Sequence, residues 1–412
     1  MELFTVISIL ITLSALFSYI NHRFLKMPTT IGLMFMSIAV SVGLIVLDGF
    51  GLGFLDETRA FVREIDFDKL LMGGMLSFLL FAGSLHVNIN DLLDRKWEIG
   101  ILASLGTAGS TFLVGASTFF LLKLLGLDVP LIYCLVFGAL ISPTDPIAVL
   151  GILKKTGATK SLKTKITGES LFNDGIGVVV FTIMLEIAVS GHGADAREII
   201  LFFLEEGVGG IAYGLVLGVS AYYILKSVDN YQVEILVTLA VTTGGYALAL
   251  AMHTSGPLAI VTAGLLIGNH GRKFAMSDTT TRRLDTFWEL LDEILNAVLF
   301  LLIGFEVLVL TLSGRYILAG TIIIPLVILA RFITVGLPVS LMKFFQDFSP
   351  NAIKVMTWGG LRGGISVALA LSVPPGPNRE IVLTMTYAVV VFSILVQGMT
   401  IKYLVKNPEA GE

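Results

Sequence analysis

The chain has 412 residues, of which 55% are hydrophobic and 14% are charged, with a formal net charge of −4. Soluble domains carry about 25% charged residues, so the composition excludes a soluble protein and leaves no room for a sizeable soluble domain. There is no basic tail to bind nucleic acid, and the one cysteine, Cys134, excludes a disulfide framework.

Apolar segments long enough to span a bilayer follow one another along the chain. The sequence predicts an all-α membrane protein of about thirteen transmembrane helices, which form one compact domain over residues 1–412, without a soluble regulatory domain. The predicted spans are 3–21, 29–49, 68–86, 98–122, 131–153, 166–188, 199–225, 232–252, 256–270, 287–312, 316–342, 351–374 and 380–404.

Basic residues concentrate in alternate loops, as the positive-inside rule expects of cytoplasmic segments. The odd-numbered loops carry most of the Lys and Arg residues, among them Lys160, Lys163 and Lys165, whereas the second loop, 51–67, is acidic. The rule places the N-terminus outside and the C-terminus in the cytoplasm of a plasma or inner membrane.

Two of the predicted spans contain helix-breaking sequences near their middle. The fifth reads Ser-Pro-Thr-Asp-Pro at 142–146, and two prolines three residues apart remove helical hydrogen bonds. The twelfth has four glycines around Arg362 at 359–364. Because the fifth and twelfth spans are an odd number of positions apart, the two broken helices run in opposite directions. Paired broken helices in two inverted halves indicate the binding site of a transporter.

The sixth predicted span opens with a group of polar residues. Glu169, Ser170, Asn173 and Asp174 precede the apolar run 178–188. Asn173 and Asp174 lie about eight residues, or roughly 12 Å, into this span, which is near the middle of a hydrocarbon core about 30 Å thick. An ionised group at that depth costs a few kcal/mol or more, so it indicates a functional site.

Two arginines, Arg331 and Arg362, also fall mid-span. Arginine keeps its proton, so each needs a partner. Glu169 would form a neutral structural pair with one of them, and we favour Arg331 because the unbroken eleventh helix can hold it rigidly. Arg362 would then compensate the second break and face either Asp145 or backbone dipoles. Asp145 itself either caps its own break or joins the ion site.

If Glu169 pairs with Arg331 and Arg362 compensates a break, Asp174 has no dedicated counter-charge. Asp174 can therefore bind either a proton or a small hard cation such as Na+, with oxygens from Ser170, Thr144 and water completing the shell. Competition of the two ions for one carboxylate is sufficient for exchange. Asn173 and Asp145 lie at a similar depth and complete the predicted group of cation- and proton-binding residues.

Other features predict structural roles. Gly210, Gly214 and Gly218 have the spacing of close helix packing rather than of a specific dimer seam. Trp97 and Trp288 lie near the starts of predicted spans, where tryptophan anchors a helix at the membrane interface.

No enzyme or cofactor motif stands in the sequence. It has no Walker loop, no nucleophile elbow and no HExxH pair, and its five histidines have no zinc-site spacing. We therefore expect no enzymatic activity and no cofactor beyond the transported ions.

The motifs resemble those of the monovalent cation/proton antiporter family, in the sodium/proton exchanger branch with an Asn-Asp pair. The resemblance covers nearly the whole chain. It rests on Glu-Ser-Leu-Phe-Asn-Asp at 169–174, on Ser-Pro-Thr-Asp-Pro at 142–146, on the buried Arg331 and on Gly-Gly-Leu-Arg-Gly at 359–363.

The resemblance implies the antiporter fold, with thirteen spans, an inverted repeat and two unwound crossing helices. It implies a homodimer in which a core of the third to sixth and tenth to thirteenth spans moves like an elevator against a dimerisation part of the other spans. It also implies that Asp174 carries the ion, that Ser170 and the Thr144 backbone assist, that Asn173 supports them and that Glu169 pairs with arginine. Relatives often have an acidic residue where this chain has Ala82, so a second carboxylate from the third span is not expected here.

The sequence thus predicts a secondary antiporter that exchanges Na+, or Li+ or K+, for H+, with electroneutral 1:1 stoichiometry and a role in pH homeostasis. Its partners are monovalent cations, protons and membrane lipid. A sodium-coupled symporter for an organic anion is the closest alternative, for which Arg362 is the one candidate anion ligand. A cation channel and a membrane enzyme are the other classes considered.

Overall fold

The computed structural model describes residues 3–51, 53, 55–146, 149–151, 153, 159–191, 196–311, 313–344, 348 and 351–405. Over these ranges the chain is built of helices and contains no β-strand, only one isolated bridge of two residues. The first part of the chain forms α1 (Leu3–Ile20), α2 (Thr29–Asp48), α3 (Leu55–Glu64), α4 (Phe67–Leu70), α5 (Leu76–Leu85), α6 (Ile89–Leu93), α7 (Lys96–Leu124), α8 (Leu131–Ile141), α10 (Lys160–Ser190) and α11 (Ala196–Phe203).

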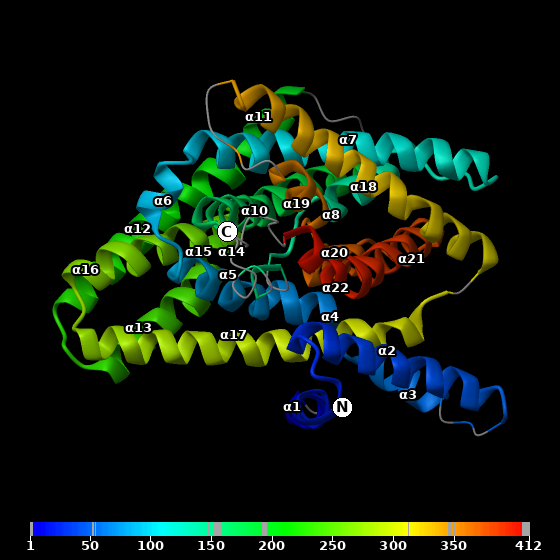
Figure 1. Ribbon diagram of the computed structural model, residues 1–412, viewed down its shortest axis with the longest axis horizontal. Coiled ribbons are helices and arrows are strands. Elements are labelled where there is room, and N and C mark those ends of the chain that lie inside the picture. The colour runs from blue at the N-terminus through cyan, green and yellow to red at the C-terminus, as the bar shows by residue number, and fades with distance from the viewer. Residues whose placement is uncertain are drawn as a thin grey trace, which may run out of the picture.

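In chain order, α11 is followed by α12, α13 and α14 (Figure 1). Several consecutive helices, such as α13 and α14, are joined by a single wide helical turn and continue one another. The bounds are α12 (Gly209–Lys226), α13 (Tyr231–Ala240), α14 (Tyr246–Ala251), α15 (Gly256–Leu266), α16 (Arg272–Phe274), α17 (Asp278–Glu306), α18 (Gly314–Met342), α19 (Ala352–Trp358), α20 (Gly364–Leu371), α21 (Pro377–Phe392) and α22 (Gly398–Val405).

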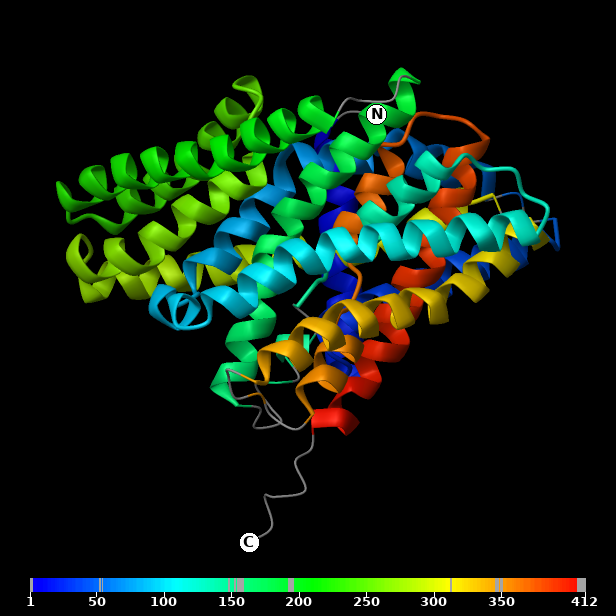
Figure 2. The same cartoon turned by 90° about the horizontal axis from the view of Figure 1, so that it is seen from above.

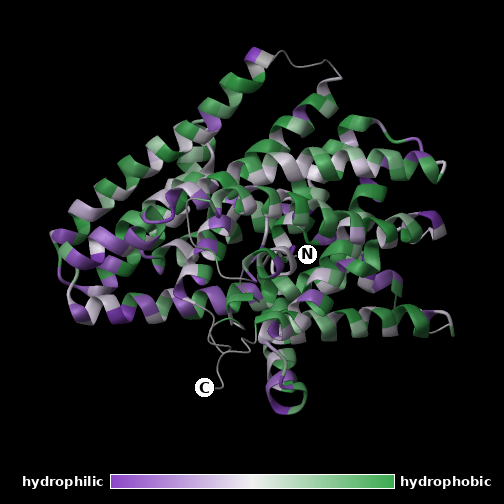
Figure 3. Ribbon diagram, turned by 45° about the horizontal axis from the view of Figure 1, so that its top comes forward, coloured by the Kyte–Doolittle hydropathy of each residue, from purple (hydrophilic) through white to green (hydrophobic). Residues whose placement is uncertain are grey.

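Eight helices in the described ranges are long and apolar enough to cross a membrane. Hydrophobic residues cover most of the helical ribbon, and hydrophilic ones gather at helix ends and bends (Figure 3). The chain is therefore a multi-pass, all-α membrane protein. The count of thirteen spans, the inverted repeat and the division into two moving parts remain predictions.

Two helix starts differ from the predicted spans because polar caps extend the helices. Thr159 accepts a hydrogen bond from the Leu162 backbone N–H at 3.3 Å, so α10 begins at Lys160 rather than at residue 166. Asp174 is consequently the fifteenth of the 31 residues of α10, at its centre. Ser277 likewise caps α17, which begins at Asp278 rather than at residue 287.

The helices that carry the predicted site lie at the centre of the bundle. α10 packs against α7, α8 and α15, and α18 packs against α7, α19 and α21. In contrast, α12, α13 and α16 gather at one end of the molecule and α21 lies toward the other (Figure 1, Figure 2). A polar group on α10 is therefore shielded from lipid on several sides.

The glycine spacing in α12 serves packing within the chain, as predicted. A Cβ atom at Gly210, Gly214 or Gly218 would lie 2.7 Å from the Ser255 oxygen, 2.4 Å from the Ala259 oxygen and 2.8 Å from the Leu266 side chain. Without these Cβ atoms, α12 lies directly on the backbone of α15.

Two side chains lie in positions that the sequence did not predict. The prediction of Trp288 as an interface anchor is wrong, because its ring is fully buried against Phe81 with a centroid distance of 4.6 Å. The assignment of Lys165 to a cytoplasmic loop is also wrong. Lys165 lies within α10, 2% exposed, with its amine 3.6 Å from Glu98 and 3.5 Å from the centre of the Phe348 ring.

Replacing Gly214 by alanine should destabilise the protein, because the added Cβ meets the Ala259 carbonyl at 2.4 Å. Overpacking of this kind costs about 1–3 kcal/mol, which a lowered thermal unfolding midpoint in detergent would report. Gly43→Ala on α2 is the matched control, since a Cβ there meets nothing within 4 Å. Equal midpoints for the two variants would contradict this account of the α12–α15 contact.

Candidate functional site

Two non-helical segments meet at the centre of the protein. α8 ends at Ile141, and residues 142–146 continue in a non-helical course. α19 ends at Trp358 and α20 begins at Gly364, so that residues 359–363 are also non-helical. The Asp145 backbone N–H donates to the Leu361 carbonyl at 2.8 Å, which joins the two segments as an isolated antiparallel bridge.

Arg362 holds this crossing together. Its Nη1 donates to the carbonyl of Ser142 and, at 2.8 Å, to that of Pro143. Its backbone N–H donates to Ser393 Oγ at 2.9 Å. The guanidinium therefore satisfies carbonyls that the prolines of the first segment leave without helical partners. The sequence analysis expected Arg362 to face either Asp145 or backbone dipoles, and in the structure it faces backbone carbonyls, those of the other segment rather than of its own.

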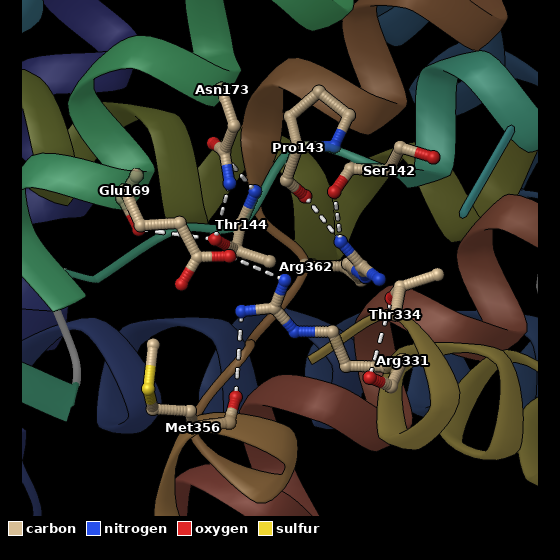
Figure 4. A network of polar contacts seen from close by, with 10 residues as sticks. Ser142, Pro143, Thr144, Glu169, Asn173, Arg331, Thr334, Met356 and Arg362 are labelled. Carbon is tan, nitrogen blue, oxygen red and sulfur yellow. Dashed lines mark hydrogen bonds and ion pairs between the residues drawn. The ribbon is translucent and has the colours of Figure 1, made fainter. Parts of the chain in front are cut away.

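The polar face of α10 lies against the first non-helical segment. Gly177 permits the approach, since a Cβ there would lie 2.3 Å from the Pro143 ring. Asn173 Oδ1 accepts from the Thr144 backbone N–H at 3.2 Å, and its Nδ2 donates to Thr144 Oγ1 at 2.9 Å (Figure 4). The Thr144 hydroxyl accepts from Asn173 and also lies 3.1 Å from Ser170 Oγ, a contact in which either hydroxyl can donate.

Glu169 and Arg331 form a buried ion pair next to this network. Arg331 Nη1 lies 2.6 Å from Glu169 Oε1, and its Nη2 donates to the Met356 carbonyl at 3.4 Å (Figure 4). The two residues are 5% and 1% exposed. The pair links α10, α18 and α19, and Arg331 is thus the arginine that neutralises Glu169.

Asp174 lies beside the pair but is not part of it. The residue is 8% exposed and lies on the wall of a cavity of about 840 Å³, together with Asp145. No ion pair joins Asp174 to a basic residue in the described part of the chain. A buried carboxylate without a counter-ion that borders an open cavity can take up a proton or a cation from it.

Asp145 is held by the second non-helical segment. A Cβ at Gly363 would lie 2.4 Å from Asp145 Oδ2, so the carboxylate rests on the glycine backbone. Both Asp145 and Gly363 line the cavity. The structure therefore brings Asp174 and Asp145 to one cavity, while Ser170, Asn173 and Thr144 form the hydrogen-bonded wall behind them.

Sequence reasoning missed a second polar wall of the same cavity. Glu289, Asp292 and Glu293 on α17 and Ser366 on α20 line it, as does Asn296. The spacing 289, 292, 293 and 296 lies on one helical face, and this was the available signal. It went unused because the predicted span began at 287, which placed the acidic residues at a membrane boundary.

Comparison with known proteins agrees with this geometry. The family model described as "Sodium/hydrogen exchanger, transmembrane" matches residues 11–407. The chain belongs to the sodium/hydrogen exchanger family. This is a family of transporters, so the protein is a transporter and not an enzyme.

Other sodium/hydrogen exchangers resemble the chain over almost its whole length. It is 47% identical over 407 residues to the Na(+)/H(+) antiporter NhaP of Pseudomonas aeruginosa, which covers 98% of this chain and 96% of the relative. It is 36% identical to the Na(+)/H(+) antiporter NhaH of Halobacillus aidingensis over 93% of each chain. The structure of the sodium proton antiporter MjNhaP1 from Methanocaldococcus jannaschii superimposes with a TM-score of 0.78 at 19% identity, covering 98% of this chain and 99% of that one, which shows a shared fold.

Replacing Glu169 by glutamine should leave Arg331 buried and uncompensated. Breaking a buried ion pair from one side costs about 3–5 kcal/mol, which a lower thermal unfolding midpoint in detergent would report. The double variant Glu169→Gln, Arg331→Met should be less destabilised than Glu169→Gln alone, because it removes the orphaned charge. Strictly additive effects of the two substitutions would contradict the pairing.

Proposed function

We propose that the protein exchanges Na+ for H+ across a cell membrane, with Asp174 as the group that carries either ion. The observation that supports this most directly is a carboxylate at the centre of a transmembrane helix, without a described ion pair, on the wall of an open cavity. The relatives NhaP and NhaH are themselves named Na(+)/H(+) antiporters.

In this proposal each residue of the site has a distinct task. Asp174 binds Na+ or a proton, and Ser170 Oγ and Thr144 supply neutral oxygens for the cation. Asn173 holds Thr144 in place through its two hydrogen bonds. Asp145 adds negative charge at the mouth of the site. Glu169 and Arg331 form a neutral pair that holds the scaffold, and Arg362 fixes the crossing through the Ser142 and Pro143 carbonyls.

The lining of the cavity indicates the side of the membrane to which it opens. Lys26, His86 and Lys163 line the cavity. Lys26 and His86 lie in or next to the first and third loops and Lys163 in the first turn of α10, and the positive-inside rule assigns all of these segments to the cytoplasmic side. We infer an inward-open state, with the N-terminus outside and the C-terminus in the cytoplasm. Alternating access in a homodimer, by movement of a core against a dimerisation part, would then release the ion outside.

The organic-anion symporter is less well supported. Arg362 was its candidate ligand, and its Nη1 is engaged by the carbonyls of Ser142 and Pro143. A channel is distinguished by its flux, because an exchanger saturates with substrate and couples the two ions.

Asp174→Asn should abolish cation-driven proton flux in proteoliposomes, because an amide can neither release a proton nor neutralise a cation. Glu186→Gln is the matched control, since Glu186 lies exposed on α10 twelve residues beyond Asp174 and should leave exchange unchanged. Assays with Na+, Li+ and K+ in turn would identify the cation. Unaltered flux in Asp174→Asn would overturn the proposed ion site.

Exchange should be electroneutral, because one carboxylate alternates between two monovalent loads. At fixed Na+ and pH gradients, an imposed membrane potential should leave both the rate and the reversal point of proton flux unchanged. A reversal point that moves with the potential would show unequal stoichiometry.

A further inference from the structure

Polar residues of α17 form a wall of the cavity that the proposed ion site does not use. Glu289, Asp292, Glu293 and Asn296 lie on one helical face, since each is three or four positions from another of them, and all line the cavity. Glu289 and Glu293 are exposed, Asp292 is half-buried and Asn296 is 3% exposed. The face therefore runs from the accessible part of the cavity into the protein interior, with carboxylates first and a neutral amide last.

Asn296 has one unpaired polar atom, its side-chain oxygen. Its Oδ1 is buried and accepts no hydrogen bond from the described residues. Ser366 Oγ, on α20 and 1% exposed, lines the same cavity and also lacks a partner there. A buried polar atom without a partner costs about 1–3 kcal/mol, so oxygens in this state, next to a cavity, indicate a bound species that the protein is built to receive.

The position of this face relates it to the ion site. Leu299, three residues after Asn296, packs against Gly364, where an added Cβ would lie 2.6 Å from the leucine side chain. The adjacent Gly363 supports Asp145. Asp174, Asp145 and Asp292 all line the same cavity, so the face of α17 and the ion site border one space.

The donor set indicates what binds. A carboxylate, an amide oxygen and a hydroxyl are hard ligands suited to alkali cations. This donor set contains one carboxylate and two neutral oxygens, so its charge matches a monovalent rather than a divalent cation. A monovalent cation that retains part of its water shell fits both the charge and the size of the cavity.

We propose that Asp292 and Asn296, with Ser366, form a second cation position that Na+ occupies before it reaches Asp174. This position rests on the proposed exchange function and determines how readily the exchanger loads. The cation loses part of its hydration shell at Asn296 while Asp292 neutralises its charge, so the later transfer to Asp174 requires less dehydration in one step.

The test is the Na+ dependence of proton flux in proteoliposomes. In Asn296→Ala and in Asp292→Asn we expect the KM for Na+ to rise about tenfold while kcat stays within about twofold. The reason is that a change in Na+ binding before translocation affects KM alone. Asn296→Asp keeps an oxygen acceptor and should show a KM at or below that of the wild type. Asn90→Ala is the control, because Asn90 is exposed and does not line the cavity.

A second measurement separates this position from Asp174. In the Asp174→Asn background, Na+ should still raise the thermal unfolding temperature in detergent, and adding Asn296→Ala should remove that shift. A purely structural role of Asn296 would instead lower kcat and the unfolding temperature without Na+.

The outcomes distinguish the two proposals. Flux in Asp174→Asn equal to the wild type would overturn the exchange mechanism itself. Loss of proton flux in Asp174→Asn, together with an unchanged KM for Na+ in both Asp292→Asn and Asn296→Ala, would overturn the second cation position. The exchange mechanism would then still stand.

Discussion

The site depends on one constraint, which is that backbone groups freed where two helices break inside a membrane must find partners within the protein. The two non-helical segments solve this together. Arg362 of one donates to the carbonyls of Ser142 and Pro143 in the other, and the Asp145 N–H donates to the Leu361 carbonyl. Because each segment supplies hydrogen-bond partners to the other, neither could be non-helical without the other. Their crossing fixes the positions of Thr144 and Asp145.

The distribution of charge around the crossing separates scaffold from function. Glu169 and Arg331 are paired, and Arg362 Nη1 donates to the carbonyls of Ser142 and Pro143. The carboxylates that face the cavity, Asp174 and Asp145, are instead placed where an ion can reach them. The Glu169–Arg331 pair thus holds helices together, whereas the carboxylates on the cavity wall are the ones we propose to bind the ion.

Sequence reasoning located the helices, both non-helical segments and the buried charges of the site because the membrane imposes strong rules on a chain. Apolar length identified the helices, proline and glycine identified both non-helical segments, and mid-span charge identified Asp174 and Arg331. It misplaced Trp288 and Lys165 because both lie near the ends of predicted spans. There, the local sequence is the same whether the side chain lies at the membrane interface or packs inside the bundle. The starts of α10 and α17 were also late, since the capping residues Thr159 and Ser277 lie in polar stretches.

The sequence alone determined that this is a polytopic helical membrane protein with a buried acidic site at Asp174, because hydropathy and the cost of burying charge can be judged one segment at a time. Only the tertiary structure decided which groups meet. That Arg362 serves the opposite segment, that Asn173 orients Thr144, and that Asn296 borders the same cavity as Asp174 depend on contacts between helices far apart in the chain. Such contacts arise from packing and have no signature in local composition.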